Sequence, residues 1–193
     1  RSLVERIALY IPIYRGYRQK NLRRDEDRAV RQEVARVLST AKDDLVTIQR
    51  ATVGNLQLMR DTDRILAKAD KYYIEVKKGA GGYSAFHDSV KILEAELDQL
   101  IEWDARLIDT AQDLKALTES TISRIDLGEC PLPADIRDLE RLIDGLIEEY
   151  NSRETVMRGF VADGPQEEAP VEAAPAGEAE EPKKKKGLFG WRK

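Results

Sequence analysis

Residues 90–118 read VKILEAELDQLIEWDARLIDTAQDLKALT, and this stretch decides the fold class of the chain. Its seam positions recur in alternating steps of three and four residues, the period of an amphipathic α-helix that packs like a coiled coil. These positions are Val90, Leu93, Leu97, Leu100, Asp104, Leu107, Ala111, Leu114 and Thr118. We therefore expect a long helix, capped at its start by Ser84 or Asp88.

Three more segments carry the same period. They are Val30, Val34, Val37, Ala41, Leu45, Ile48 and Thr52; Leu58, Thr62, Ile65, Ala69, Tyr73 (or Tyr72) and Val76; and Ile136, Leu139, Ile143, Leu146, Tyr150, Arg153, Met157 and Phe160. Gly54-Asn55, the GAGG motif from Gly79 and the ECPLP motif at 129–133 separate the helices. The sequence predicts an all-α, antiparallel bundle of about four long helices with coiled-coil-like seams.

The two ends of the chain differ from this bundle. Residues 1–17 form a short amphipathic N-terminal segment, in which Pro12 should end a first helix. Residues 18–161 then make the bundle, and residues 162–182 an acidic linker. The linker is rich in Ala, Pro and Glu and cannot bury enough apolar surface to fold, so we expect the C-terminal tail to be disordered. Residues 183–193, KKKKGLFGWRK, form a basic-aromatic motif.

The composition leaves little room for catalysis. The chain has 193 residues with one cysteine, Cys130, and one histidine, His87, so neither an internal disulfide nor a zinc or di-iron site with several histidines is expected. A nucleophile would have to pair His87 with Ser84 or Cys130, and no oxyanion hole is evident. We therefore expect no cofactor, no metal and no enzyme. A ligand or catalytic site at the His87 end is the distant alternative.

Two charged residues interrupt apolar seams. Asp104 lies within the third long stripe and Arg153 within the fourth. If these two helices form an antiparallel hairpin around Gly128, both residues are nearly equidistant from the turn and should face each other. We predict that they pair and fix the register of the helices. The alternative is that both point sideways into water.

A second group of residues should gather at one end of the bundle. When the first two long helices fold back at Gly54, the arginines near the N-terminus approach the GAGGYS junction. The group consists of Arg15, Arg18, Arg23, Arg24, Tyr83, Ser84 and His87. A cationic, aromatic end of this kind suits an acidic partner or a lipid headgroup. The alternative is a connecting loop sealed by aromatic packing.

The tail carries the sharpest functional signal. Its basic residues are Lys183, Lys184, Lys185, Lys186, Arg192 and Lys193, and its apolar residues are Leu188, Phe189 and Trp191. Anionic lipid attracts such basic side chains by about 1 kcal/mol each, and the aromatic rings add burial at the interface. Two other uses remain open. The motif could insert into a groove of a partner protein, or its lysines could simply neutralise the seven carboxylates between Asp163 and Glu181.

Part of the chain resembles a known group of proteins. Residues 11–31, IPIYRGYRQKNLRRDEDRAVR, and residues 63–104 are similar to a family of uncharacterised prokaryotic helical proteins with a GYxGY–RR opening and a GYSxFxDxVK junction. The matching positions are Gly16, Tyr17, Arg23, Arg24, Gly82, Tyr83, Ser84, Phe86, Asp88 and Lys91. The resemblance implies a helical fold and, because that family is of unknown function, no activity.

These features favour a non-catalytic scaffold or adaptor that docks through its tail to an anionic membrane surface or a membrane-associated complex. The alternative is a soluble adaptor whose tail binds a groove of a protein partner. Exposed heptad faces could also join two copies. The net charge of −4 gives no reason to expect nucleic acid as a partner. No apolar stretch reaches 18 residues, so we expect a cytoplasmic protein that binds the inner face of a membrane peripherally.

Overall fold

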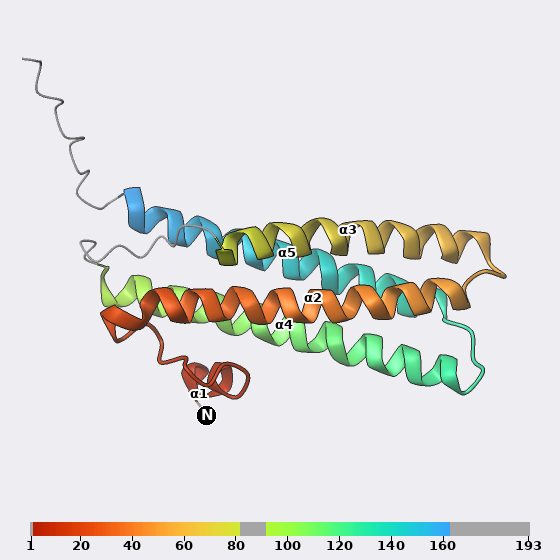
Figure 1. Ribbon diagram of the computed structural model, residues 1–193, viewed down its shortest axis with the longest axis horizontal. Helices are drawn as coiled ribbons and strands as arrows, with labels where there is room; N and C mark the ends of the chain where they lie inside the picture. The colour runs from red at the N-terminus through yellow and green to blue at the C-terminus, as the bar shows by residue number, and fades with distance from the viewer. Residues whose placement is uncertain (1, 82–91, 163–193) are drawn as a thin grey trace, which may run out of the picture.

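The computed structural model describes residues 2–81 and 92–162 and consists of helices (Figure 1). The elements are α1 (Leu3–Ala8), a 3₁₀ turn (Lys20–Leu22), α2 (Arg23–Ala51), α3 (Leu56–Gly81), α4 (Glu94–Asp126) and α5 (Pro133–Ala162). The described part of the chain contains no strand. The predicted all-α bundle of four long helices behind a short N-terminal helix is confirmed.

The four long helices form two hairpins that pack side by side. Consecutive helices run antiparallel, whereas α2 packs against α4 in parallel and α3 against α5 in parallel (Figure 1). Side-chain contacts show the parallel alignment: Arg153 bridges Asp27 of α2 and Asp104 of α4, and further along Gln112 of α4 donates to Glu33 of α2 at 3.3 Å. Helices α2 and α5 consequently face each other across the core.

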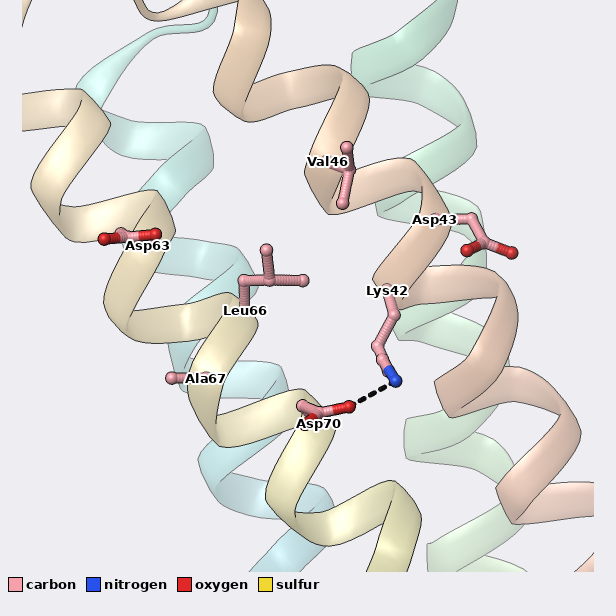
Figure 2. Close-up of a pocket in the computed structure, with 7 residues that line it drawn as sticks. All are labelled: Lys42, Asp43, Val46, Asp63, Leu66, Ala67 and Asp70. Atoms are coloured by element: carbon pink, nitrogen blue, oxygen red, sulfur yellow. Dashed lines mark hydrogen bonds and ion pairs between the residues drawn. The ribbon is translucent and has the colours of Figure 1, made fainter.

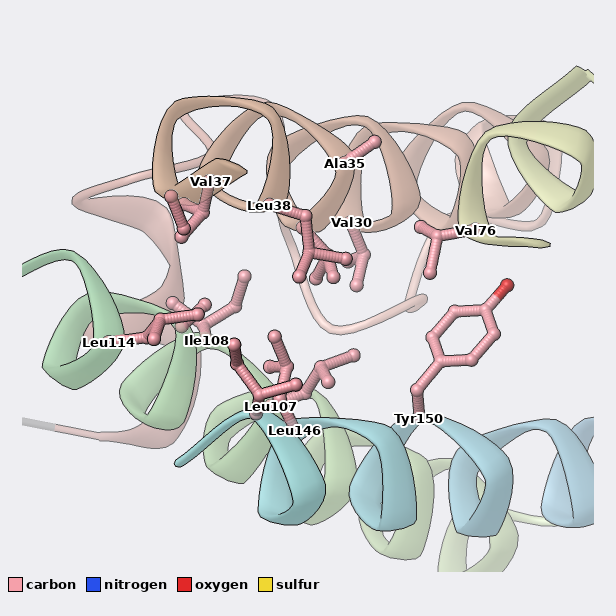
Figure 3. Close-up of a cluster of buried hydrophobic side chains, with 14 of the residues drawn as sticks. Val30, Ala35, Val37, Leu38, Val76, Leu107, Ile108, Leu114, Leu146 and Tyr150 are labelled. Carbon is pink, nitrogen blue, oxygen red and sulfur yellow. The ribbon is translucent and has the colours of Figure 1, made fainter. Parts of the chain in front are cut away.

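The predicted seams form this core. Figure 3 shows side chains of α2, α3, α4 and α5 converging on one apolar interior, with Val30, Leu107 and Leu146 among them. Every predicted seam position in α2 and α5 is buried, as are those of α4 from Leu97 onward. Burial of apolar side chains on this scale is the main favourable term in folding.

Two predicted helix boundaries are wrong. Helix α4 begins at Glu94, whereas the predicted seam began at Val90, and Leu93 is 67% exposed outside the helix. The predicted cap residues Ser84 and Asp88 lie outside the described residues. The acidic first turn explains this start. Glu96 accepts a hydrogen bond from the backbone N–H of Leu93 at 2.8 Å, and negative charge is favourable at a helix N-terminus. Helix α3 also continues to Gly81, beyond the break predicted at Gly79.

The bundle has two distinct ends. The N-terminal segment and the last turn of α5 lie at one end, which we call the near end, and the loops at 52–55 and 127–132 lie at the other, the distal end (Figure 1). The residues that follow Ala162 therefore leave the bundle at the end where the N-terminal segment packs.

Candidate functional site

A buried charge cluster lies in the near half of the bundle. Arg153 of α5 is wholly buried, and its Nε donates to Oδ1 of Asp104 at 2.5 Å while its Nη2 donates to Oδ1 of Asp27 at 2.8 Å. The predicted contact between Asp104 and Arg153 is thus present, and the alternative in which both side chains point into water is wrong. Asp27 extends the contact to a third helix, a partner that the sequence analysis missed.

A second arginine completes the cluster. Nε of Arg31 lies 3.2 Å from both carboxylate oxygens of Asp27, and its Nη1 lies 2.8 Å from Oε1 of Glu154 and 2.7 Å from the hydroxyl of Tyr150. Two buried arginines therefore oppose two buried aspartates, with Glu154 at the edge. Charge balance and multiple hydrogen bonds are what a buried ionic group requires.

The electrostatics keep Arg153 and Asp27 ionised. Burial acts to lower the pKa of Arg153, but the charges of Asp104 and Asp27 outweigh it and hold that pKa well above its ordinary value. For Asp27 burial acts to raise the pKa, and the neighbouring Arg153 and Arg31 outweigh it and lower the pKa below 3.8. Asp27 and Arg153 are therefore both charged at neutral pH.

The N-terminal segment inserts two tyrosines into this cluster. The hydroxyls of Tyr14 and Tyr17 donate to Oδ2 of Asp104 at 2.7 and 2.6 Å, and Arg153 donates to the Tyr17 hydroxyl at 3.1 Å. Both rings are fully buried and meet edge to face, with centroids 5.4 Å apart. Burial, and next the charge of Asp104, raise the pKa of both hydroxyls, which therefore remain donors.

A tight turn places these tyrosines. Gly16 and Tyr17 both adopt positive φ, at 70° and 58°, and the latter is uncommon for a bulky residue. The buried Glu26 secures the turn, because its Oε2 accepts the backbone N–H groups of Arg15 and Tyr17, both at 2.9 Å. Arg23 donates from Nε to the Tyr17 carbonyl at 2.8 Å. A Cβ at Gly16 would lie 3.0 Å from Ile101 of α4, so the turn also packs tightly against the bundle.

With Tyr14 and Tyr17 buried, the segment exposes an apolar and cationic surface. Leu9, Tyr10 and Ile13 are 60%, 44% and 48% exposed. The exposed cations Arg15 and Arg18 follow directly, and we call these five residues the N-terminal surface. Between residues 9 and 24 the sequence has five basic residues and no acidic one.

The predicted cationic end is brought together only in part. Arg15, Arg18 and Arg24 are exposed, whereas Arg23 is buried and supports the turn. Tyr83, Ser84 and His87 lie outside the described residues, and so do the tail residues Lys183–Lys193. Sequence reasoning missed Tyr14, Glu26 and Asp27. Of these, Asp27 had a signal, because it continues the α2 stripe one step before Val30.

A shallow groove lies between α2 and α3 (Figure 2). It encloses about 390 Å³ and is lined by Lys42, Asp43, Val46, Asp63, Leu66, Ala67 and Asp70. Nζ of Lys42 forms an ion pair with Asp70 across the groove and lies 4.7 Å from the centre of the Tyr73 ring. None of the predicted site residues lines this groove. Its lining residues lie outside the apolar seams, so the periodicity of the apolar residues did not indicate it.

Within the described ranges 2–81 and 92–162, no three His, Cys, Asp or Glu side chains converge as metal ligands. Nor does any described helix combine the length and the apolar character needed to cross a bilayer. Comparisons with models of protein families, with curated proteins and with solved structures gave no significant match.

Proposed function

We propose that this protein is a non-catalytic scaffold that docks on an anionic membrane surface through its near end. The observation that carries the proposal is the N-terminal surface, where Leu9, Tyr10 and Ile13 project from a stretch with four exposed cations, one buried arginine and no acid. An apolar group ringed by basic residues suits the boundary between lipid headgroups and acyl chains. If the partner were instead a protein surface of mixed charge, the N-terminal surface would be expected to carry acidic residues as well as basic ones.

The turn at Gly16 supports the same proposal. Three apolar side chains stay exposed because Tyr14 and Tyr17, from the same segment, are locked to Asp104 in the core. The backbone of the segment is therefore already ordered before binding, so its apolar residues can contact a membrane without a further loss of backbone conformational entropy. Preorganisation of this kind strengthens binding, because less conformational entropy is lost on contact.

The tail adds a second attachment at the same end. Helix α5 ends at Ala162 at the near end, and the sequence beyond it closes with four lysines followed by Leu188, Phe189 and Trp191. A single weak membrane signal gives only marginal, reversible binding, whereas two signals together give stable anchoring. The N-terminal surface and the tail supply two.

Co-sedimentation with vesicles tests this function. The variant Leu9→Ser/Ile13→Ser should lose about tenfold or more in affinity for vesicles rich in phosphatidylserine, since each buried apolar side chain contributes up to about 1.5–3 kcal/mol. The matched control is Val53→Ser/Leu127→Ser, which removes two even more exposed apolar side chains at the distal end and should bind like the parent. Deletion of residues 183–193 should also weaken binding.

Salt and lipid composition give the decisive comparison. Binding should fall as ionic strength rises and should be weak on phosphatidylcholine alone, because the basic residues contribute only with anionic lipid. Failure of the parent chain to pellet with anionic vesicles at low salt contradicts the proposed function. So does a distal-end variant that loses as much binding as the near-end variant.

A further inference from the structure

We propose that the groove between α2 and α3 is a docking site for the chain's own C-terminal segment, residues 183–193. The contact itself does not depend on lipid. Its consequence for membrane binding rests on the proposed function, and the experiment below separates the two.

The groove has an apolar floor and an acidic rim. Val46 of α2 and Leu66 of α3 are its apolar lining, with Leu66 pointing toward α2 (Figure 2), and the exposed Ala67 adjoins them. Asp43, Asp63 and Asp70 line it together with a single cation, Lys42, which pairs with Asp70. Asp63 accepts a hydrogen bond from Gln49 at 2.7 Å, and the carboxylate of Asp43 points away from α3 (Figure 2). The rim therefore carries an excess of negative charge next to an apolar patch.

The C-terminal segment has the complementary chemistry. It contains six basic residues and no acidic one, together with Leu188, Phe189 and Trp191. A groove of about 390 Å³ is at the small end of ligand sites and accommodates one aromatic side chain with a neighbour. We assign the floor to Trp191, because Arg192 and Lys193 follow it directly and can then reach Asp43 and Asp63.

The tail is long enough to reach the groove. Arg153 of α5 is level with Asp27 of α2, so Lys42 lies fifteen residues further along α2, or about 22 Å at 1.5 Å per residue. Ala162 lies nine residues beyond Arg153 in the opposite direction, or about 14 Å. The span is therefore about 36 Å. Twenty-eight residues separate Ala162 from Trp191, and a random coil of that length has a root-mean-square end-to-end distance of about 30 Å.

Tethering favours this occupant over a free peptide. A flexible linker whose average length matches the span gives an effective concentration in the millimolar range. Even if the groove binds the C-terminal segment with low affinity, this effective concentration lets the segment occupy the groove in competition with a dilute partner. The groove is also built from exposed, charged positions, so it needs no rearrangement of the core to accept the segment.

Docking in the groove regulates the attachment that the tail makes. Trp191 and the basic residues cannot contact the groove and a lipid surface at once. A docked fraction therefore lowers the apparent membrane affinity in proportion to the free fraction that remains. Disabling the groove should accordingly tighten binding to anionic vesicles by about three- to tenfold.

The experiment uses tail fluorescence in the full chain without lipid. In a Trp103→Phe background Trp191 is the single tryptophan, since the chain has two. Its emission should lie to the blue of that of a synthetic peptide of residues 183–193, and acrylamide should quench it less. Asp43→Lys/Asp63→Lys should abolish both differences. The control Asp113→Lys/Asp126→Lys, which changes two exposed aspartates of α4, should retain them.

Three other outcomes overturn the proposal that the tail docks in the groove. Emission equal to that of the peptide means that the tail does not dock, whether or not the chain pellets with vesicles. Protection of Trp191 that survives the groove reversal means that the tail sits elsewhere, for instance on its own acidic linker. Protection that rises with protein concentration assigns the groove to the tail of a second copy. Loss of vesicle binding with full protection of Trp191 contradicts the proposed function alone.

Discussion

Arg153 is the residue on which the interior depends. A guanidinium with no exposed surface is strongly unfavourable unless its donors find acceptors. Here Asp104, Asp27 and the Tyr17 hydroxyl accept from Nε and Nη2, and Glu154 of the same helix lies 3.4 Å from Nη1. The first three acceptors come from α4, from α2 and from the N-terminal segment. A shift of any one helix by a turn would leave buried charges without partners. We therefore infer that the cluster specifies one register among the many that apolar seams alone would allow.

Removing one charge from the cluster tests this role. Asp104→Asn keeps the shape of the side chain but leaves Arg153 short of one counter-charge, and we expect it to lower the free energy of unfolding by about 3–5 kcal/mol. The matched control is Asp113→Asn, an exposed position on the same helix, with an expected change within about 0.5 kcal/mol. Urea unfolding followed by circular dichroism measures both. Equal stabilities for the two variants would contradict a stabilising role for the cluster.

Acid should weaken the same cluster through Asp27. Its pKa is lower in the folded protein than the ordinary value of 3.8, so its ionised form stabilises the fold fully above pH 4 or so. That contribution is lost as the pH falls from the ordinary pKa through the folded one. The unfolding free energy of the parent should therefore fall more steeply below about pH 4 than that of Asp27→Asn. Urea titrations of both proteins at neutral pH and at pH 3 measure the difference, and parallel decreases would refute it.

The sequence predicted this cluster only in part, for a physical reason. A charge within an apolar stripe is visible, so Asp104 and Arg153 could be paired from spacing alone. Asp27 is also a charge on an apolar stripe, three residues before Val30, and could have been found in the same way. Tyr14 and Tyr17 do not, because they come from a segment without helical period, and nothing local shows that a turn with two positive φ values aims them inward.

At the scale of elements, the approach of α3 to the rest of the bundle depends on Gly79. A Cβ built there would lie 2.7 Å from Nη1 of Arg31 and 2.7 Å from the hydroxyl of Tyr150. Arg31 cannot easily withdraw, since Asp27 and Glu154 hold it. The glycine that looked like a helix break is instead a contact point within α3.

Gly79→Ala should therefore destabilise the protein despite the better helix propensity of alanine. An uncrowded site would gain up to about 1 kcal/mol from this substitution, whereas overpacking typically costs about 1–3 kcal/mol. Gly145→Ala in α5 is the control, because its Cβ would meet nothing closer than 4.0 Å, and it should raise the melting temperature. Thermal unfolding compares the two. A stabilising Gly79→Ala would mean that α3 does not pack as closely as the structure shows.

The element boundaries and the neighbours of each helix were only partly predictable. Periodicity locates helix interiors well, since burial enforces it, but it does not show where a helix starts. The start of α4 at Glu94 is stabilised by Glu96, whose carboxylate accepts the backbone N–H of Leu93. The parallel packing of α2 beside α4 was also not predictable, because apolar seams fit either neighbour and only contacts such as Gln112 to Glu33 reveal the choice.

On the scale of the whole molecule, the bundle has two ends that are built from different elements. The near end holds the N-terminal surface and releases the tail, and the charge cluster beneath it fixes the geometry of that end. The distal end consists of two connecting loops and carries the single cysteine, Cys130, which is exposed. With about 50 Å of helix in α4 between them, the ends can contact different things at the same time.

Energy transfer to the bilayer should reveal this polarity. A donor dye on the native Cys130 should transfer weakly to acceptor lipids in anionic vesicles, because the distal end is expected to face away from the membrane. The same dye at the near end, on Asn21→Cys in a Cys130→Ser chain, should transfer more strongly, since Asn21 is exposed beside the N-terminal surface. Leu9→Ser/Ile13→Ser should reduce transfer from the near-end dye. Stronger transfer from Cys130 than from position 21 would place the wrong end on the bilayer and would reverse the proposed orientation of the scaffold.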